Sequence, residues 1–246
     1  MPIVEVNGLT KVYGEGDAAV TALDHVDLSV DQGEFVAVMG PSGCGKSTLL
    51  NLVGGLDKPT DGRVVIDGID IATMTDTAVT ELRRKRLGFV FQFFNLIPVL
   101  TVTENAALPL TLDGVSTAAA NAKAVEWLGR VGLAEKLDSR PDQLSGGQQQ
   151  RVAVARALVT EPALVLADEP TGNLDTKSAT EIADLLKQAA DEWGRAVVMV
   201  THDPRIAAHA RRMIFMRDGK IVDDVHIDGA DAGAAAREAM EKAGLL

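Results

Sequence analysis

The sequence of 246 residues is 46% hydrophobic, which is enough for a packed core in one large domain or two small ones. Its 24 basic and 35 acidic side chains leave a net charge of −11, which disfavours a broad electrostatic surface for nucleic acid or anionic lipid. No apolar run approaches the roughly 20 residues that cross a bilayer, and the N-terminus lacks a signal-peptide pattern, so we expect a cytoplasmic protein without direct membrane insertion.

The first predicted elements are strands, because short apolar runs alternate with polar and glycine-bearing turns over residues 3–38. The last of these runs, FVAVM at 35–39, leads into GPSGCGKS at 40–47, and a helix-period run follows. Strand, glycine loop and helix in this order are typical of a phosphate loop, G-x-x-x-x-G-K-[ST]. In such a loop Lys46 reaches the phosphates and Ser47 supplies a hydroxyl to Mg²⁺, whereas the alternative is a chance glycine turn before a buried helix.

In the middle of the chain, two further predicted strands lead into a segment with a helical pattern. Val64–Gly68 and Leu87–Gln92 read as further strands, and the short basic run 83–86 between them reads as a solvated helix face without a role. We then expect a mostly helical insert over 93–158, with an alanine-rich helix at 117–133.

The remainder returns to alternating strands and helices, with strands at 163–168 and 196–201, a helix at 176–193 and a hairpin at 213–222. This alternation predicts an α/β fold with a mainly parallel sheet. The Ala-, Asp- and Gly-rich end has a possible helix at 232–243 and is expected to be a tail, 226–246. Neither solenoid repeats nor a low-complexity linker is present, so 2–225 is expected to be one composite domain.

A second glycine motif, LSGGQ at 144–148, opens another helix-period run with Val152, Ala155 and Val159 on one face. Free backbone N–H groups at the start of a helix form a candidate anion site. The sequence shows no second nucleotide fold to accompany this second loop, which leaves its ligand unexplained.

The strand at 163–168 ends abruptly in two carboxylates, Asp168 and Glu169. Beside a phosphate loop, an acidic residue at a strand end holds Mg²⁺ and a second carboxylate polarises an attacking water. The alternative is a pair of solvated acids after a strand. Cys44 is the sole cysteine, which excludes an internal disulfide and a cysteine zinc cluster, and the four histidines lack metal-ligand spacing.

The phosphate loop at 40–47, LSGGQ at 144–148 and LADEPTGNLD at 166–175, in this order, resemble the ATPase subunit of an ABC transporter. The resemblance covers roughly residues 2–225 and implies a phosphate-loop NTPase fold with a mainly parallel sheet, N-terminal antiparallel strands and a helical subdomain. It also implies ATP as substrate and Mg²⁺ as cofactor. The implied nucleotide contacts within one chain are Tyr13, Gly40, Pro41, Ser42, Gly43, Cys44, Gly45, Lys46, Ser47 and Thr48.

The same resemblance implies roles for residues that would otherwise be read as ordinary polar positions. Gln92 matches the Q-loop glutamine, which contacts Mg²⁺ and the water and links to the transmembrane partner; its alternative is a polar strand end. His202 matches the switch histidine at the γ-phosphate, although a lone histidine after a strand is usually without function. The implied catalytic set is therefore Glu169, His202, Gln92 and Lys46, and the implied metal set is Ser47, Gln92 and Asp168.

Two further predictions concern Tyr13 and Cys44. Tyr13 stands where the family places an aromatic ring on adenine, and a half-buried strand tyrosine is the alternative. Cys44 has no catalytic part, but its position near Lys46 and a helix N-terminus predicts a lowered thiol pKa and easy alkylation that ATP blocks.

The resemblance further implies a homodimer that forms on ATP binding, with two copies facing head to tail. ATP then lies between Lys46 of one copy and Ser145, Gly147 and Gln148 of the other, with Gly146 in the same nucleotide-binding motif. Asp175 matches the D-loop aspartate, which is expected among the nucleotide-binding residues and communicates across the dimer. A separate transmembrane permease is the implied partner, which places the chain peripherally on the inner face of the membrane. Residues 93–98 resemble the segment that receives the permease, and a buried insert core is the alternative.

Within the family, the motifs most resemble the branch that serves macrolide export, lipoprotein release, peptide resistance and cell division. Two rival functions remain. A soluble ABC ATPase of DNA repair or translation usually has a second cassette, coiled coils or zinc modules, which this sequence lacks. A regulator that binds nucleotide without turnover is opposed by the presence of both Glu169 and His202.

Overall fold

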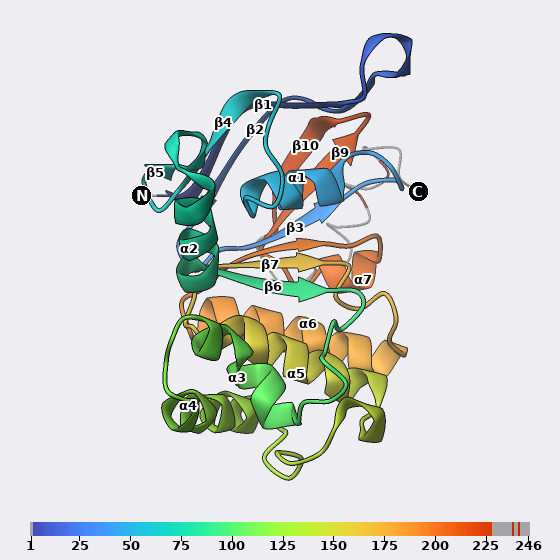
Figure 1. Ribbon diagram of the computed structural model, residues 1–246. Coiled ribbons are helices and arrows are strands. Elements are labelled where there is room, and N and C mark those ends of the chain that lie inside the picture. Colours follow the sequence, from blue (N-terminus) through green and yellow to red (C-terminus); the bar gives the residue numbers. More distant parts are fainter. Residues whose placement is uncertain (1, 228–237, 239–240, 242–246) are drawn as a thin grey trace.

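The computed structural model describes residues 2–227, 238 and 241 (Figure 1). Except at 238 and 241, the tail helix expected over 232–243 lies outside the described residues. The strands are β1 (Pro2–Tyr13), β2 (Val20–Asp31), β3 (Phe35–Met39), β4 (Asp61–Ile66), β5 (Ile69–Asp70), β6 (Leu87–Phe91), β7 (Leu164–Asp168), β8 (Ala196–Val200), β9 (Arg212–Arg217) and β10 (Lys220–His226). The α-helices are α1 (Lys46–Val53), α2 (Asp76–Arg86), α3 (Val102–Leu112), α4 (Thr117–Arg130), α5 (Gly146–Leu158), α6 (Thr176–Asp191) and α7 (Pro204–Ala207), and the short 3₁₀ turns are η1 (Gly16–Ala18), η2 (Ile71–Thr73) and η3 (Pro141–Gln143).

The strands form two sheets. The larger has the order β10-β9-β3-β8-β7-β6, in which the neighbours from β9 to β6 are parallel and β10 is antiparallel to β9. The smaller has the order β2-β1-β4-β5 and is antiparallel throughout. The predicted mainly parallel sheet with antiparallel N-terminal strands is therefore confirmed. β1 and β2 are each 12 residues long, far longer than the short apolar runs that predicted them.

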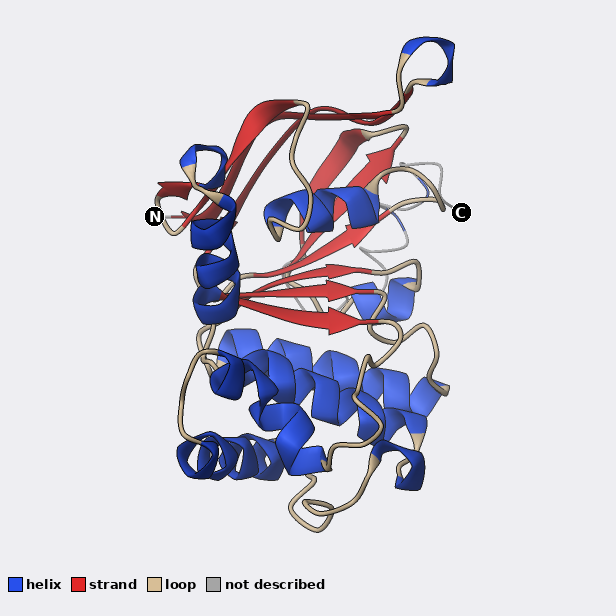
Figure 2. Cartoon of the chain, viewed as in Figure 1, coloured by secondary structure: helices blue, strands red, loops and turns tan. Residues whose placement is uncertain are grey.

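Layers of helix cover the large sheet. Figure 2 shows α1 between the two sheets, with α5 and α6 on the opposite face of the large sheet and α3 and α4 beyond them. Every residue of β3 and β8 is buried, as expected for strands that are covered on both faces. One hydrophobic core lies between the sheets around α1, and the other lies between the large sheet and the helices.

Glycines end two helices earlier than the sequence predicted. α4 stops at Arg130 and not at 133, because Gly132 takes a left-handed φ of 78° just after the helix. α6 stops at Asp191 and not at 193, and Gly194 follows with a φ of 66°. Over the described residues, no helix combines the length and apolar character that crossing a membrane requires.

The basic end of α2 is more than a solvated face. The Arg83 guanidinium donates to the carbonyl of Gly55 at 2.8 Å, and that of Arg84 donates to the carbonyl of Leu112 at 2.9 Å. Both arginines are half-buried. The expectation of a freely solvated cluster was therefore wrong for these two side chains, because the segments they join come together only in the folded chain.

Candidate functional site

Three neighbouring parallel strands end at one edge of the large sheet. β3 leads into the glycine loop, β7 ends at Asp168 with Glu169 next, and β8 is followed by Thr201 and His202. In sheets of this kind, ligands bind outside the carboxyl ends of the strands. Strand order thus brings the glycine loop, the paired carboxylates and the histidine together.

The glycine loop follows a path that only glycine permits at two positions. Gly40 has a φ of 155°, and a Cβ there would lie 2.2 Å from the carbonyl oxygen of Met216. Gly45 has a φ of 104°, and a Cβ there would lie 2.3 Å from the carbonyl oxygen of Ala22. Backbone atoms cannot yield as side chains do, so these two glycines set the curl of the loop.

Lys46 lies inside that curl. Its Nζ donates to the carbonyl oxygens of Gly40 at 2.7 Å and Pro41 at 2.8 Å, and its side chain is buried. The loop's own carbonyls thus hold the ammonium group at the base of the loop, where the backbone N–H groups that begin α1 are also directed.

Ser47 and Asp168 connect the loop with β7. The Ser47 hydroxyl donates to Oδ1 of Asp168 at 3.0 Å. Burial raises the pKa of the Asp168 carboxyl above its usual value, although the bond from Ser47 and the charge of Lys46 oppose the rise. The result is a pair of oxygen donors that suits a hard cation such as Mg²⁺.

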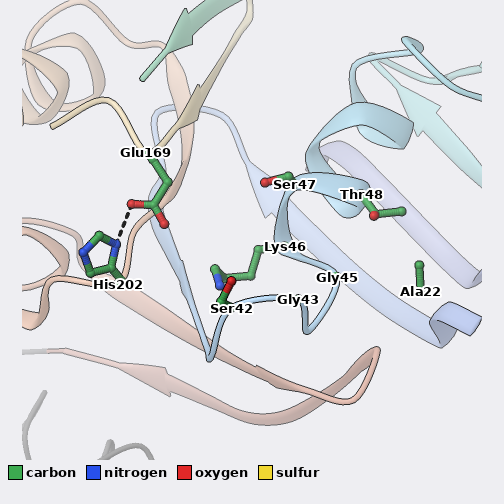
Figure 3. Close-up of a pocket in the computed structure, with 9 residues that line it drawn as sticks. All are labelled: Ala22, Ser42, Gly43, Gly45, Lys46, Ser47, Thr48, Glu169 and His202. Atoms are coloured by element: carbon green, nitrogen blue, oxygen red, sulfur yellow. Dashed lines mark hydrogen bonds and ion pairs between the residues drawn. The ribbon is translucent and has the colours of Figure 1, made fainter. Parts of the chain in front are cut away.

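Glu169 and His202 form the second polar pair of the site. Nδ1 of His202 and Oε2 of Glu169 are 2.7 Å apart, as the dashed line in Figure 3 shows. Glu169 has a φ of 47°, a left-handed conformation that is unfavourable for a non-glycine residue. Such strain is typical of functional sites whose surroundings hold the backbone in place.

These groups line a pocket of about 490 Å³ (Figure 3). Its lining residues are Ala22, Ser42, Gly43, Gly45, Lys46, Ser47, Thr48, Glu169 and His202. All but one were predicted from the sequence. Ala22, on β2, was missed, because nothing in its local sequence indicates that this strand passes over the loop.

Tyr13 lies at the end of β1, beyond the lining of the pocket. Its hydroxyl donates to Oδ2 of Asp57 at 2.9 Å, and Nζ of Lys11 lies 4.8 Å from the ring centroid. Burial, followed by the bond to Asp57, raises the pKa of the Tyr13 phenol, while the Thr48 side chain opposes the rise. The ring is 42% exposed, so Lys11 and Asp57 orient an aromatic surface that remains open to a ligand.

Cys44 differs from the expectation. Its thiol is buried, and burial raises the pKa of Cys44 despite the opposing charge of Lys46. The predicted lowering of the pKa was therefore wrong, because desolvation disfavours the thiolate more than the neighbouring ammonium favours it.

The LSGGQ segment lies apart from this pocket, which has no lining residue from 144–148 among the described residues. Ser145 is exposed and caps α5, with its hydroxyl accepting from the Gln148 N–H at 3.3 Å. Gly147 is buried, and a Cβ there would lie 2.7 Å from Oγ of Ser178. This contact places the start of α5 against the first turn of α6.

Asp175 caps that neighbouring helix. Its carboxylate accepts from the backbone N–H of Ser178 at 3.0 Å and from the Ser178 hydroxyl at 2.7 Å. These bonds, the backbone one first, lower the pKa of Asp175. Asp175 thus lies beside the LSGGQ segment and outside the lining of the pocket.

Gln92 follows β6, and its side chain is directed to the loop after Glu169. Its Nε2 donates to Oδ1 of Asn173 at 3.3 Å, and a Cβ on Gly172 would lie 2.8 Å from the same nitrogen. The structure therefore brings Gln92 beside the segment between Glu169 and Asp175, and Gln92 is not among the residues that line the pocket.

Comparisons with known proteins agree on the family. The family described as ABC transporter matches residues 23–172. The chain is 46% identical over 233 residues to an uncharacterized ABC transporter ATP-binding protein, MJ0796 of Methanocaldococcus jannaschii, covering 93% of this chain and 99% of that one. It is 46% identical to the lipoprotein-releasing system ATP-binding protein LolD of Geobacter metallireducens, covering 90% of this chain and 99% of that one.

A longer relative and a solved structure extend these matches. The macrolide export ATP-binding/permease protein MacB of Hyphomonas neptunium is 45% identical over 98% of this chain, which spans only 36% of that protein. A dimeric structure of a post-hydrolysis state of the ATP-binding cassette MJ0796 bound to ADP and Pi has a TM-score of 0.84 at 45% identity, covering 92% of this chain and all of that one. With the motifs, the fold and these matches in agreement, the chain belongs to the ABC transporter family of ATP-binding cassettes.

Proposed function

We propose that the chain hydrolyses ATP in two sites shared between two copies of itself and thereby energises a separate membrane permease. One observation carries the proposal. The glycine loop, Glu169 and His202 line one pocket, and Asp168 is hydrogen-bonded to Ser47 beside it, while the LSGGQ segment begins a helix at an exposed position outside the pocket. Each chain therefore presents two different halves of a site.

In the proposed ATP complex, the phosphates lie on the glycine loop, from Gly40 to Thr48. Lys46 exchanges its bonds to the loop carbonyls for the β- and γ-phosphate oxygens, and adenine stacks on the open face of Tyr13. Ser47, Asp168 and Gln92 are the proposed holders of Mg²⁺. The bound ion supplies positive charge to the β- and γ-phosphates as negative charge develops there.

Hydrolysis follows from the positions of Glu169 and His202. The Glu169 carboxylate accepts a hydrogen bond from the attacking water, which forms a bond to the γ-phosphorus as the bond to the β,γ-bridging oxygen breaks. His202 leaves Glu169 to contact the γ-phosphate and orient it. Lys46 and the backbone N–H groups that begin α1 stabilise the charge of the transferred phosphoryl group.

The second half of each site comes from a partner copy. In the proposed head-to-tail dimer, Ser145, Gly146, Gly147 and Gln148 of one copy face the γ-phosphate held by the other, and Asp175 lies at the contact between them. The two composite sites lie in a single interface and are related by its twofold axis. The dimeric MJ0796 structure with ADP and Pi supports this arrangement by likeness.

A groove beside the helical layer supports docking of a permease. It has a volume of about 420 Å³, lies between α2, β6 and α5, and is lined by apolar and basic side chains that include Phe89, Phe91 and Arg84. Phe93 lies just after β6 and is 70% exposed, whereas Phe94 is half-buried next to Gly146. We place the permease at this groove and assign the exposed anchor to Phe93. Exposed aromatics are typical of interface hot spots.

This proposal implies a domain division and a location. The ATPase domain spans 2–225, with a helical subdomain at about 93–158 that bears the LSGGQ segment, the docking groove lies where this subdomain meets α2 and β6, and 226–246 is a tail. The chain lies on the cytoplasmic face of a membrane through its permease. Export, lipoprotein release, peptide resistance and mechanical signalling are the candidate tasks, by likeness to the branch that includes MacB and LolD.

The decisive experiment compares two variants of the purified chain. Glu169→Gln is expected to retain ATP and accumulate as a dimer with turnover lower by about 10²-fold or more, because it binds the nucleotide without activating water. Lys46→Ala is expected to lose both ATP binding and dimerisation. Size-exclusion chromatography with ATP and a phosphate-release assay measure both, and a monomeric Glu169→Gln chain loaded with ATP would contradict the proposal.

The permease contact has its own test. Phe93→Glu is expected to abolish transport by a co-expressed permease and to leave the ATPase rate of the isolated chain unchanged. Val222→Glu, at an exposed apolar position on β10, is the matched control and should preserve both. Unimpaired transport by the Phe93→Glu complex would remove Phe93 from the interface.

A further inference from the structure

Gln150 connects the LSGGQ helix with two catalytic segments. It lies in the second turn of α5, and its side chain is fully buried. Its Nε2 donates to the carbonyl oxygen of Phe91 at 3.1 Å and to that of Pro170 at 2.6 Å. Phe91 directly precedes Gln92, and Pro170 directly follows Glu169. One amide group therefore binds the backbone on either side of the proposed catalytic edge.

The oxygen atom of the Gln150 amide shows that packing alone does not explain why a glutamine stands at this position. Oε1 of Gln150 is buried and has no hydrogen-bond partner in the described part of the chain. A buried acceptor without a partner is unfavourable, and an apolar side chain of similar shape would avoid it. What glutamine supplies here, and methionine cannot, is the pair of N–H donors to Phe91 and Pro170.

The two carbonyls belong to backbone that needs support from outside the sheet. β6 is the last strand of the sheet within the described residues, where one of its edges has no neighbouring strand. Glu169 is in the left-handed region at φ 47°, and its backbone is otherwise held by bonds to Val200 and Gly172. Gln150 adds a contact from the helical layer, and so fixes both segments against α5.

We propose that Gln150 is a positioning residue for hydrolysis, which holds the segments of Gln92 and Glu169 against the LSGGQ helix. The inference rests on the proposed ATPase function. In the proposed dimer, Ser145 faces ATP held by the partner, whereas Glu169 acts on ATP held by its own chain. Gln150 joins these two elements within one chain, so the two composite sites are mechanically linked through it.

The test is the steady-state kinetics of Gln150→Met in the full chain. This substitution keeps the length and removes both donors. Because Gln150 contacts neither nucleotide nor metal, we expect kcat to fall by about 10- to 100-fold, as for a misplaced catalytic group, while the KM for ATP changes less than about twofold. ATP-driven dimerisation is retained. Gln150→Leu, which also removes both donors, should lose kcat similarly.

A matched control removes an amide elsewhere. Gln188, in the last turn of α6, donates to Glu192, and Gln188→Met should leave kcat and KM unchanged. Hydrogen exchange provides a second readout, because faster exchange confined to residues 91–95 and 169–174 is expected in Gln150→Met. Unchanged exchange in both segments would contradict the positioning role.

The outcomes separate this inference from the function on which it rests. Absence of hydrolysis by the wild-type chain overturns the proposed function. Wild-type hydrolysis together with an unchanged kcat in Gln150→Met overturns only the positioning role, as does a parallel loss of kcat, ATP affinity and melting temperature. If Gln150→Met does not fold, the shorter amide of Gln150→Asn carries the test by the same kcat and KM criteria; failure of both to fold makes Gln150 structural and also overturns the proposal.

Discussion

Two helices of this chain begin at glycine-bearing loops, and their surroundings differ in kind. α1 begins in a pocket, where Lys46, Ser47, Glu169 and His202 converge. α5 is capped by exposed Ser145, whose hydrogen bonds within the described part of the chain join it to Gln148 and to none of those groups. A helix N-terminus attracts anions in either place, but within the described residues only the start of α1 has the proposed catalytic side chains around it.

The N-terminal caps of α1 and α5 also differ. Gly45, which precedes α1, supplies no side-chain cap, so the first N–H groups of that helix remain available for phosphate. Ser145 and Gln148 form a capping box that satisfies part of the start of α5. This difference supports the proposal that α1 begins the phosphate site and that α5 of a second copy completes it.

The strongest way to break this comparison is a mixing experiment. Lys46→Ala and Ser145→Arg are each expected to lower ATPase activity by about 10²-fold or more, because each removes one half of both sites. A mixed dimer contains one intact site, formed by the unaltered Lys46 of one copy and the unaltered Ser145 of the other. Equimolar mixing should therefore restore activity in a phosphate-release assay.

The control for the mixing experiment combines two substitutions that both alter the pocket half of the site. Lys46→Ala mixed with Glu169→Gln leaves no intact site in any dimer and should remain inactive. Recovery in this control, or none in the mixture of Lys46→Ala with Ser145→Arg, would refute the division of the site between two chains.

Alanine substitutions at Gly45 and Gly147 test the same difference between the two loops, with a smaller expected effect. Gly45→Ala meets the backbone carbonyl of Ala22 at a positive φ, so we expect it to lower the free energy of unfolding by about 2 kcal/mol and to impair ATP binding. Gly147→Ala meets both Oγ of Ser178 at 2.7 Å and Cβ of Ser178 at 2.9 Å, and rotation of the hydroxyl relieves only the first contact. Because this neighbour is a side chain and helix propensity favours alanine, we expect a smaller loss, of about 1 kcal/mol.

Urea unfolding measures both glycine variants. Gly129→Ala, in α4 with open space around its Cβ, is the control and should stabilise the chain by about 0.5–1 kcal/mol. Equal losses in Gly45→Ala and Gly147→Ala would show that the two loops are equally constrained, against the comparison.

Substitution of Tyr13 tests whether nucleotide affinity depends only on the half of the site that contains the glycine loop. Tyr13→Ala should raise the KM for ATP about tenfold and leave kcat nearly unchanged, because base stacking contributes about 1–3 kcal/mol. Tyr13→Phe keeps the ring, loses the hydroxyl bond to Asp57 and should stay within about threefold of wild type. A large fall in kcat with unchanged KM would assign Tyr13 to catalysis and not to binding.

The smallest effect concerns Cys44. Burial raises its thiol pKa, so alkylation should be slow at neutral pH and should accelerate as the pH rises through that raised pKa, where the reactive thiolate forms. ATP should slow the reaction at every pH by covering the loop. Mass spectrometry with iodoacetamide measures the rate, Cys44→Ala is the unreactive control, and rapid alkylation at neutral pH would restore the original expectation of a lowered pKa.

Periodicity and motif spacing predicted much of the fold. The buried strands β3, β7 and β8 are continuous apolar runs, and burial on both faces makes such runs easy to recognise. The long β1 and β2 were only partly predicted, because their polar positions face outward on an antiparallel sheet. The ends of α4 and α6 differed by two or three residues, since glycines after them took left-handed conformations.

The candidate site divides in a similar way. The positions of Lys46, Asp168, Glu169 and His202 at one edge follow from strand order. Sequence patterns indicated the first three, and only the family resemblance indicated His202. The partners of Gln92 and the contacts of Arg83 could not be predicted, because they depend on which distant loops come together. The sequence did not indicate a role for Gln150, because the sequence around a polar residue in a helix does not reveal whether its side chain is buried.

The sequence by itself determined the family, the sheet-forming runs and the residue types that handle phosphate, because motif spacing and apolar periodicity are local properties. Tertiary structure alone decided that the LSGGQ segment lies outside the phosphate pocket, that burial raises the Cys44 pKa, and that Gln150 joins α5 to Pro170, the residue after Glu169. Those outcomes depend on desolvation and on contacts between residues far apart in the chain, and both exist only after the chain has packed.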